Sequence, residues 1–291
     1  MKKIKMAVSL TVLLAADVFS QTPINGYSDA DISASKALRE RIEHALSLGK
    51  ESEWMGNYHY GDGLGSNARL VISEAEGFYY RNSGCVGLYE LDYGSIRWVE
   101  GNVQLLGTQQ RNDGPRRDIL VPVRWGERHY LLWKDQLLDF VNAVNAGMEP
   151  CQEICFQFFL KDGEQERVPP GVPQLPAPYR DYLLSRPITA KVIAVVQAKT
   201  HRLGDGDAGM TERITRVVID QGSRYGVRDW MTLYVDDGRA SVWGIRAVIR
   251  SIKESSSEID LIQDIADEDK ASYTAPKVGW TVSTTPYKKA E

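Results

Sequence analysis

A cysteine in a glycine-rich turn, Cys85 within N-S-G-C-V-G at residues 82–87, is the best candidate for covalent chemistry in this sequence. A cysteine thiol becomes a strong nucleophile when a histidine removes its proton, and the two residues need to be neighbours only in space. His59 and His129 are the histidines considered for this base. A Cys85-dependent enzyme is therefore one hypothesis, and a buried or disulfide-bonded cysteine in a hairpin is the alternative.

The same turn resembles the serine-x-glycine-cysteine motif of exported L,D-transpeptidases, which remodel peptidoglycan with a histidine-activated cysteine. The resemblance implies a cell-wall substrate, with Cys85 as the nucleophile. It is partial, because Gly87 stands where that family has arginine and no His-Gly pair precedes the cysteine. The chain also lacks Gly-x-Ser-x-Gly and His-Glu-x-x-His motifs, so no second catalytic signature supports an enzyme.

Two glycine-rich loops suggest phosphate or cation binding. Residues 61–66, G-D-G-L-G-S, look like a phosphate loop, but that chemistry needs a helix to follow, whereas A-R-L-V-I-S is strand-like. Asp205 and Asp207 suggest calcium, yet the twelve-residue loop pattern with its closing glutamate is absent. We interpret the first as a hairpin turn and the second as a solvated loop, and expect neither a metal site nor a cofactor.

The aromatic residues of the first half could line a binding cavity. Aromatic faces suit both apolar ligands and sugars, so a small-ligand carrier is a third functional hypothesis. Strands also favour aromatic residues for their own packing, which makes core positions the simpler interpretation. The candidate binding residues are Trp54, Tyr58, Tyr60, Tyr80, Tyr89 and Trp98.

The N-terminus has the pattern of an export signal. Residues 1–20 combine lysines with an apolar run at residues 6–16, and Val18 and Ser20 supply small residues for cleavage after Ser20. The run is shorter than the ~20 residues that span a bilayer, so we expect a periplasmic or secreted protein without a transmembrane segment. In that oxidising compartment Cys151 can pair with Cys155, or Cys85 can pair with either of them.

The chain is acidic, with a formal charge of −4. Without residues 1–20, which hold three lysines and one aspartate, 32 basic and 38 acidic side chains remain, or a charge of −6. A chain with this charge and no basic block lacks the positive surface that a nucleic acid requires. We therefore expect no nucleic-acid partner.

Hydrophobic periodicity predicts the elements that position these residues. Helical spacing predicts helices near residues 31–48 and 136–147, with Asp29 or Asp31 capping the first and Asp135 the second. Short turns allow only antiparallel neighbours, so residues 21–168 should form a meander or partial barrel covered by the two helices. Alternation with period two predicts its strands at residues 54–60, 68–73, 77–81, 85–91, 95–99, 102–106, 119–125, 129–133 and 153–160.

A change in composition divides the chain. Six of the twelve prolines fall at residues 169–187, which we interpret as an extended linker. We predict a mainly β (α+β) protein of two domains, the second a small β-barrel at residues 188–286. Its strands are predicted at residues 188–197, 213–220, 231–235, 241–252, 257–263 and 280–284, with a loop at 200–210.

The first half resembles a group of uncharacterised exported bacterial proteins, over residues 50–180. The shared motifs are W-x-G-x-Y-x-x-G-D-G-x-G at residues 54–65, Gly-Cys-x-Gly at 84–87 and V-x-W-G-x-R-x-Y-L at 123–131. This resemblance implies export and brings no activity with it.

The second half, residues 188–284, resembles the glycine-punctuated β-barrel modules of the rod-shape-determining MreC protein and of flagellar assembly protein T. The likeness rests on a strand, Gly222, Gly226-Val227 and a further hydrophobic strand, followed by a strand-turn-strand at residues 242–262. In those families such modules scaffold or bind partner proteins at the cell envelope, so the resemblance implies a similar role.

The favoured function is an exported, envelope-associated binding or scaffolding protein without catalytic activity, whose partner is an envelope protein or a cell-wall component. The alternatives are a peptidoglycan enzyme that uses Cys85 and a small-ligand carrier. They make different structural demands. The enzyme needs His59 or His129 beside Cys85, and the carrier needs an enclosed aromatic cavity in the first domain.

Overall fold

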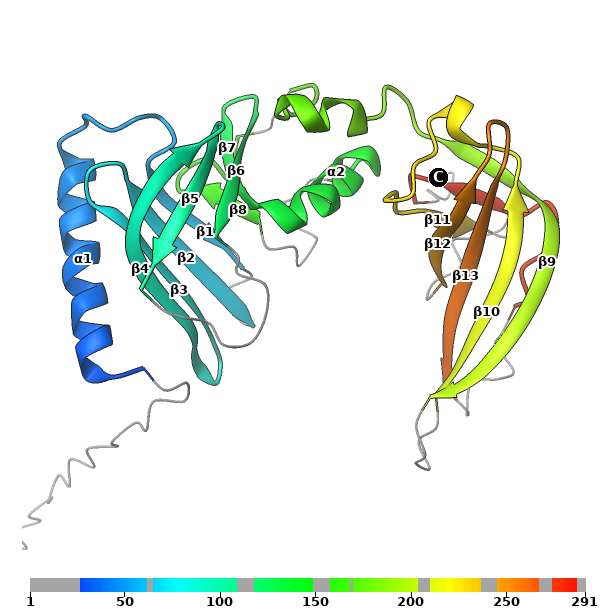
Figure 1. Ribbon diagram of the computed structural model, residues 1–291, viewed down its shortest axis with the longest axis horizontal. Coiled ribbons are helices and arrows are strands. Elements are labelled where there is room, and N and C mark those ends of the chain that lie inside the picture. The colour runs from blue at the N-terminus through cyan, green and yellow to red at the C-terminus, as the bar shows by residue number, and fades with distance from the viewer. Residues whose placement is uncertain are drawn as a thin grey trace, which may run out of the picture.

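The computed structural model describes residues 27–61, 65–108, 118–148, 158–167, 170–203, 210–236, 245–266 and 274–286. It is mainly β, with 49% strand and 19% helix, and its strands form a closed barrel and a separate six-stranded sheet (Figure 1). The predicted mainly β fold with few helices is confirmed. The expected signal sequence, Cys151 and Cys155, and the Asp205 and Asp207 loop lie outside the described residues.

The barrel is an antiparallel meander in which each strand pairs with the next along the chain. Short hairpin turns dictate this order. The last strand pairs with the first, Tyr58 lying opposite Lys161, so the partial barrel expected from the sequence is a complete one without a free edge. The strands are β1 (Gly56–Tyr60), β2 (Ser66–Ser73), β3 (Gly77–Gly84), β4 (Gly87–Val99), β5 (Asn102–Gly107), β6 (Ile119–Trp125), β7 (Arg128–Trp133) and β8 (Phe158–Lys161).

One long strand replaces two predicted ones. Residues 85–91 and 95–99 are predicted as separate strands, but β4 continues through both segments. Gly94 lies in its middle and pairs with both neighbouring strands. A Cβ atom at Gly94 would lie 2.1 Å from the carbonyl oxygen of Leu106. The glycine therefore permits a close approach between strands and does not mark a turn.

Side chains fill the interior of the barrel, because an eight-stranded barrel is just wide enough to pack them. Aromatic rings meet edge to face around Phe159, with centroid distances of 5.2 to 6.1 Å to Tyr60, Trp133 and Tyr80. The buried interior residues are Met55, Tyr58, Ala68, Leu70, Ile72, Phe78, Tyr80, Val103, Leu105, Leu120, Leu131, Trp133 and Phe159. These positions alternate along the strands, as one face of a β-sheet requires.

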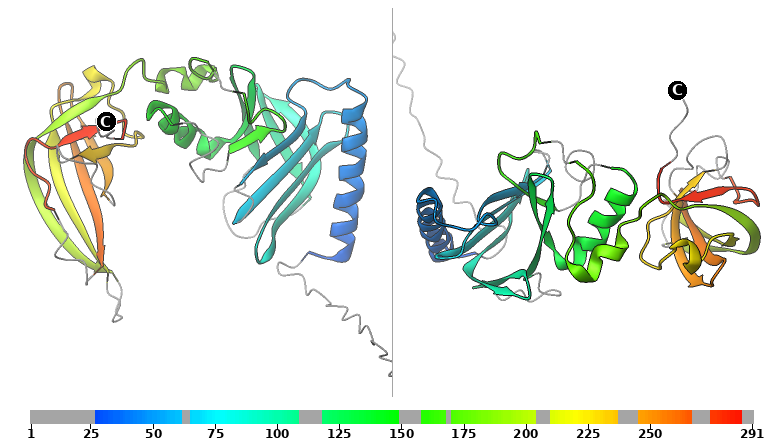
Figure 2. Two further views of the ribbon diagram at one scale, coloured as in Figure 1. Left: turned by 180° about the vertical axis from the view of Figure 1, so that it is seen from behind. Right: turned by 90° about the horizontal axis from the view of Figure 1, so that it is seen from above.

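Helix α1 (Asp29–Ser47) covers the outer face of β2, β3 and β4 (Figure 2). Its Leu38 and Ile42 are buried against Val71, Tyr79 and Leu91 of those strands. This placement is the one expected for an amphipathic helix with one apolar face. No helix in the described ranges is both long and apolar enough to cross a membrane.

The two helices begin differently from the prediction. Ser28 caps α1: its hydroxyl accepts the Asp31 backbone N–H at 3.1 Å, and the Asp31 carboxylate accepts the Ser28 backbone N–H at 3.1 Å. Asp31 is thus the acidic partner in a capping box and not the cap, while Asp29 is the first helical residue. Asp135 lies in a short 3-10 helix, η1 (Lys134–Gln136), which leads into α2 (Leu137–Asn145) without a side-chain cap.

Helix α2 packs on the outer face of β6, β7 and β8. Its Phe140 ring lies 5.2 Å from Tyr130 and 5.2 Å from Phe158, again edge to face. The proline-rich segment joins the same core, because Leu175 is buried there and the Gln174 backbone N–H donates to the Arg124 carbonyl at 2.6 Å. Residues 169–187, predicted as an extended linker, are therefore partly packed on the barrel and include the 3-10 helix η2 (Ala177–Tyr182).

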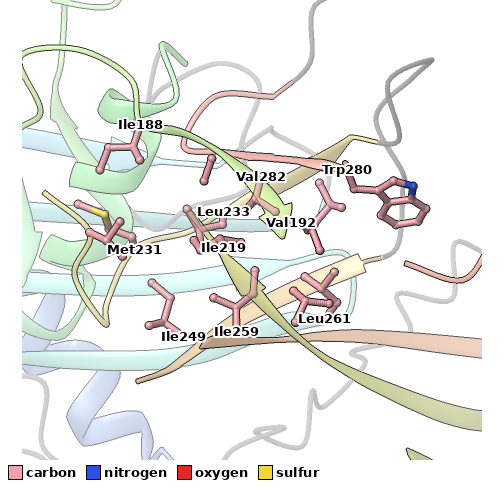
Figure 3. Close-up of a cluster of buried hydrophobic side chains, with 14 residues drawn as sticks. Ile188, Val192, Ile219, Met231, Leu233, Ile249, Ile259, Leu261, Trp280 and Val282 are labelled. Carbon is pink, nitrogen blue, oxygen red and sulfur yellow. The ribbon is translucent and has the colours of Figure 1, made fainter. Parts of the chain in front are cut away.

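The second unit is a curled sheet around its own apolar core (Figure 3). The outer strands both reach this core, with Val235 from one and Ile249 from the other. Residues 200–203 and 210, predicted as loop, belong to strands. The strand order is β11 (Tyr234–Asp236), β14 (Thr281–Ser283), β9 (Thr189–Leu203), β10 (Met210–Ile219), β13 (Ser257–Ala266) and β12 (Ile245–Ile252).

A glycine turn after β10 supports the curl. The backbone N–H of Ser223, at the start of η3 (Ser223–Tyr225), donates to the Lys253 carbonyl at 2.9 Å. A Cβ atom on Gly222 would lie 2.2 Å from the same carbonyl oxygen. Glycine at this position therefore lets two turns of the sheet pack directly against each other.

The two units meet at Asn142 of α2. Its side-chain amide donates to the Trp230 carbonyl at 3.1 Å and accepts the Thr232 backbone N–H at 3.0 Å. Beside it, the Trp230 ring lies 4.6 Å from the Tyr182 ring, between centroids. The Asn142 amide and the Tyr182–Trp230 ring pair are thus two of the contacts between the barrel unit and the second sheet.

Candidate functional site

Cys85 lies exposed in the turn between β3 and β4. Connections in an up-and-down barrel alternate between its two ends, and His129 follows the β6–β7 turn, so Cys85 and His129 lie at opposite ends. His59 is two strands away on β1 and level with Arg81, four residues before Cys85, which places its Cα about 16 Å from that of Cys85 on standard strand spacings. The fold therefore brings neither histidine within hydrogen-bond reach of the thiol.

His59 lies on the outside of the barrel. Its Nδ1 is 2.5 Å from Asp162 Oδ1, and its Nε2 is 3.2 Å from Gln165 Nε2. Both partners of the His59–Asp162 pair are partly exposed. An exposed pair of this kind contributes little to stability because water screens it.

His129 belongs to a charged cluster, buried at its centre, at the end of the barrel where β6 turns into β7. We call it the mouth cluster. Its central pair is His129 and Glu164, whose Nδ1 and Oε1 atoms are 2.9 Å apart and both of which are buried. The members are Glu53, Arg124, Arg128, His129, Lys161 and Glu164.

Both ring nitrogens of His129 contact other side chains of the mouth cluster. Arg124 Nη2 lies 2.8 Å from His129 Nε2, and a guanidinium can only donate, so Nε2 accepts. The other ring nitrogen, Nδ1, lies 2.9 Å from Glu164 Oε1. Both nitrogens are committed to protein partners, so the ring has no free nitrogen with which to act as a general base.

Arg128 is the largest fully buried side chain, 1% exposed. It donates from Nε to the Glu164 carbonyl at 3.2 Å, from Nη2 to the Gln165 carbonyl at 2.6 Å and from Nη1 to the Tyr130 hydroxyl at 3.3 Å. Backbone carbonyls and a hydroxyl thus replace water around the cation, as burial of a charge requires. The arrangement fixes the 164–165 turn against β7.

Burial also shifts two titrating groups at this end of the barrel. Burial, together with the negative charges of Glu164 and Glu53, raises the pKa of Tyr58 far above its usual range, and its hydroxyl donates to the Trp54 carbonyl at 2.9 Å. Burial lowers the pKa of Lys161, although Glu164 and Glu53 oppose that shift. The Lys161 ammonium donates to the Glu53 carbonyl, and Arg124 pairs with the Glu53 carboxylate.

The mouth cluster therefore closes the barrel. Its hydrogen bonds tie the entering segment at Glu53 to the turn before β7 and to the end of β8, and the Trp54 ring packs edge-on against His129, with 5.0 Å between the ring centroids. In the described part of the chain, no three His, Cys, Asp or Glu residues are grouped to hold a metal ion. The sequence prediction missed this cluster, because its members come from segments as distant as Glu53 and Glu164.

The aromatic candidates do not form one site. Tyr58 and Tyr80 are buried in the barrel interior, and the Tyr80 hydroxyl donates to Glu90 at 2.8 Å. Trp98 is partly exposed at the β4–β5 end, where its Nε1 donates to Glu74 at 3.0 Å. The others lie against Phe159 (Tyr60), against His129 (Trp54) and next to Gly84 at the opposite end (Tyr89).

One edge of β9 exposes a group of apolar side chains. β9 is the long curved strand at the right of Figure 1. β14 pairs with β9 only over Thr189–Lys191, so in the described residues the remaining edge, 193–203, has no strand beside it. We call this segment the β9 edge. Ile193, Val195 and Val196 are 50%, 43% and 57% exposed there.

Two β-bulges cause this exposure. In the pairing of β9 with β10, Arg216 lies opposite Gln197 but Val217 lies opposite Val195, so Val196 is an extra residue. A second shift makes Ile193 extra. Each bulge breaks the strict alternation of faces. The run of apolar residues at 192–196 lies within the strand predicted at residues 188–197. Nothing in the sequence indicated the bulges that expose it.

The β9 edge is also positively charged. The strand carries Lys191, Lys199 and Arg202 and no acidic residue, in a chain whose formal charge is −4. An edge of this kind attracts an acidic strand and repels a second copy of itself.

Comparison with known proteins finds no matching family model, no similar curated protein and no similar solved structure.

Proposed function

We propose that this protein is an exported, envelope-associated binding protein without catalytic activity, and that it binds an extended, acidic segment of a partner protein along the β9 edge. The observation that carries the proposal is an eleven-residue strand edge, 193–203, which has no strand beside it among the described residues and which exposes three apolar side chains. An added strand would satisfy the outward-facing backbone groups and cover those side chains at the same time.

Charge selects the partner. Lys199 and Arg202 lie beyond the apolar stretch, so a complementary strand would place carboxylates opposite them and valine- or threonine-like residues opposite Ile193 and Val196. Self-association is disfavoured, because two antiparallel copies would bring like charges together. The export pattern of residues 1–20 and the resemblance of residues 188–284 to envelope scaffolding barrels support the same role.

The enzyme alternative has less support. Cys85 is exposed, but His129 is committed to the mouth cluster and His59 lies about 16 Å away. The carrier alternative also has less support, because side chains pack the barrel interior.

Binding of a synthetic peptide tests the proposal. We would use a labelled peptide of about ten residues that alternates valine or threonine with glutamate, and a matched peptide with lysine in place of glutamate. Fluorescence anisotropy should show that the acidic peptide binds at least about tenfold more tightly, a difference of about 1.4 kcal/mol. Hydrogen exchange should slow within residues 193–203 on binding.

Variants localise the binding. Lys199→Glu with Arg202→Glu should reverse the peptide preference, and Val196→Thr should weaken binding of the acidic peptide. Val278→Thr, at another exposed valine, is the matched control and should leave binding unchanged. Equal binding of both peptides, no binding of either, or a preference that survives the charge reversal would refute the proposal.

A further inference from the structure

A pocket of about 460 Å³ lies where the end of α2 faces the second sheet. This volume falls in the range typical of small-molecule sites, which occur preferentially between domains. Residues of α2, β9, β11, β14 and the segment after β14 line it. They are Ala146, Gly147, Thr189, Tyr234, Val235, Asp236, Thr281, Ser283, Thr285 and Pro286.

Strand register explains why the floor of the pocket is polar. Val235, Val282 and Ala190 lie opposite one another and face the apolar core. Their neighbours in sequence therefore face the other side, toward the pocket. The side chains on that face form two cross-strand rows, Tyr234–Ser283–Thr189 and Asp236–Thr281–Lys191.

Hydroxyl groups dominate this face. Ser283 Oγ lies 3.1 Å from Thr285 Oγ1 and 3.5 Å from Thr189 Oγ1. Lys191 Nζ donates to Thr281 Oγ1 at 2.6 Å, which leaves that hydroxyl able to donate in turn. Closely spaced hydroxyls that both donate and accept match the hydrogen-bonding pattern of a polyol.

Two further groups narrow the choice of ligand. Burial raises the pKa of Tyr234, so its phenol stays protonated, and its hydroxyl lies 3.9 Å from Met148 Sδ across the junction. Asp236 and Lys191 lie at the two ends of one cross-strand row, and the Lys191 ammonium reaches Thr281 between them. The Asp236 carboxylate can accept hydrogen bonds from two neighbouring ligand hydroxyls, and the two opposite charges leave this row without a net charge that would attract a phosphate or carboxylate group.

We propose that this pocket binds a neutral saccharide of about two sugar units. The hydroxyl rows would recognise the sugar hydroxyls, Asp236 would accept from an adjacent pair of them, and Ala146 and Pro286 would contact the less polar face of the ring. The lining comes from both units, so the sugar would lie across the junction that Asn142 holds. The site is separate from the β9 edge and does not depend on the function proposed for that edge.

Saccharide binding by the full mature chain tests this inference. Saturation-transfer NMR and calorimetry would be measured with cellobiose and N,N′-diacetylchitobiose as neutral probes and with glucose 6-phosphate as the anionic comparison. We expect at least one neutral disaccharide to bind, and the sugar phosphate to bind at least about tenfold more weakly. Failure of both neutral disaccharides to bind, or equal binding of the phosphate, would overturn the inference.

Variants assign the binding to this pocket. Asp236→Asn and Ser283→Ala should each weaken disaccharide binding by about tenfold or more. Glu254→Gln, a substitution in the exposed β12–β13 turn, is the matched control and should bind as the parent does. Circular dichroism melting would confirm that each variant is folded. Disaccharide binding that is unchanged in folded Asp236→Asn and Ser283→Ala chains would show that the sugar binds elsewhere and would also overturn the inference.

Discussion

The barrel and the second sheet differ in how they treat their strand edges. In the barrel β8 returns to β1, so every strand has two partners, and the interior is packed with side chains. In the second sheet β14 covers only the first residues of β9, and the rest of that edge has no neighbouring strand in the part of the chain that the structure describes. Closure removes backbone groups from recognition, whereas an open edge presents them.

The positions of the charges follow the same division. The barrel buries Arg128, His129 and Glu164, and it satisfies them with one another and with backbone carbonyls. The second sheet also buries one charged side chain, Asp260, but it leaves the cations of the β9 edge exposed. The barrel is therefore built for stability, and the binding surfaces proposed above belong to the second sheet and to its junction with α2.

The largest effect should come from the barrel core. Phe159→Ala removes the ring around which Tyr60, Tyr80 and Trp133 pack, and we expect it to lower the free energy of unfolding by about 3–5 kcal/mol. Urea denaturation measures this change. Val196→Thr on the β9 edge is the comparison and should stay within about 0.5 kcal/mol. Similar losses in the two variants would erase the distinction between a closed core and an open edge.

The next effect concerns the mouth cluster. Glu164→Ala leaves His129 and its backbone N–H without their acceptor, and we expect a loss of about 3 kcal/mol in unfolding free energy. Glu164→Gln keeps one acceptor oxygen and should cost less. Asp162→Ala removes an exposed partner of His59 and should cost less than about 1 kcal/mol. If the Asp162 and Glu164 variants lose equal stability, the mouth cluster does not hold the barrel closed.

A smaller effect, which depends on pH, is expected in the second sheet. Arg216 donates two hydrogen bonds to the buried Asp260 carboxylate, at 2.8 and 3.1 Å, and Arg250 donates one at 2.6 Å. The Arg216 hydrogen bonds, with those of Arg250, lower the pKa of Asp260 although burial opposes them. Because the folded pKa is the lower one, the ionised carboxylate stabilises the fold above the unfolded value of about 3.9.

This stabilisation is lost as pH falls through the lowered pKa of Asp260. Asp260→Asn should therefore reduce the free energy of unfolding by about 1–2 kcal/mol at pH 7. The gap, meaning the difference in unfolding free energy between this variant and the parent protein, should shrink below about pH 4. Urea midpoints across this pH range measure the gap. Asp264→Asn, at an exposed position on the same strand, should show no gap at any pH. A constant gap for Asp260→Asn down to pH 2 would contradict the assignment.

Local patterns predicted most of the elements. Alternating residues and short turns were enough to identify antiparallel strands, and the helical spacing of Leu38 and Ile42 identified α1. The predicted strand boundaries were wrong where pairing with a third strand decides whether a strand continues. Gly94 looks like a turn in the sequence, but its place between two neighbouring strands makes it a close-contact position inside β4.

The sites were harder to predict because they depend on register and closure. Glu164 becomes the partner of His129 only when β8 pairs with β7, and neither residue has a sequence motif. The exposure of Val196 depends on a bulge that shifts it relative to β10. Asp236 and Thr281 lie opposite each other only through the pairing of β11 with β14. Single-sequence periodicity carries none of these long-range relations.

The Asn142 contact couples any rotation of the second sheet relative to α2 to a pair of hydrogen bonds. One amide holds both Trp230 and Thr232, so a twist between the units would strain two hydrogen bonds together. The fifteen-residue strand β9 extends away from this pivot, and at ~3.3 Å per residue it is a lever of about 45 Å. A rotation of about 5° at the pivot would sweep its far end through about 4 Å, nearly one inter-strand spacing. A side chain at the root of the sheet can thus set where the tip of β9 points.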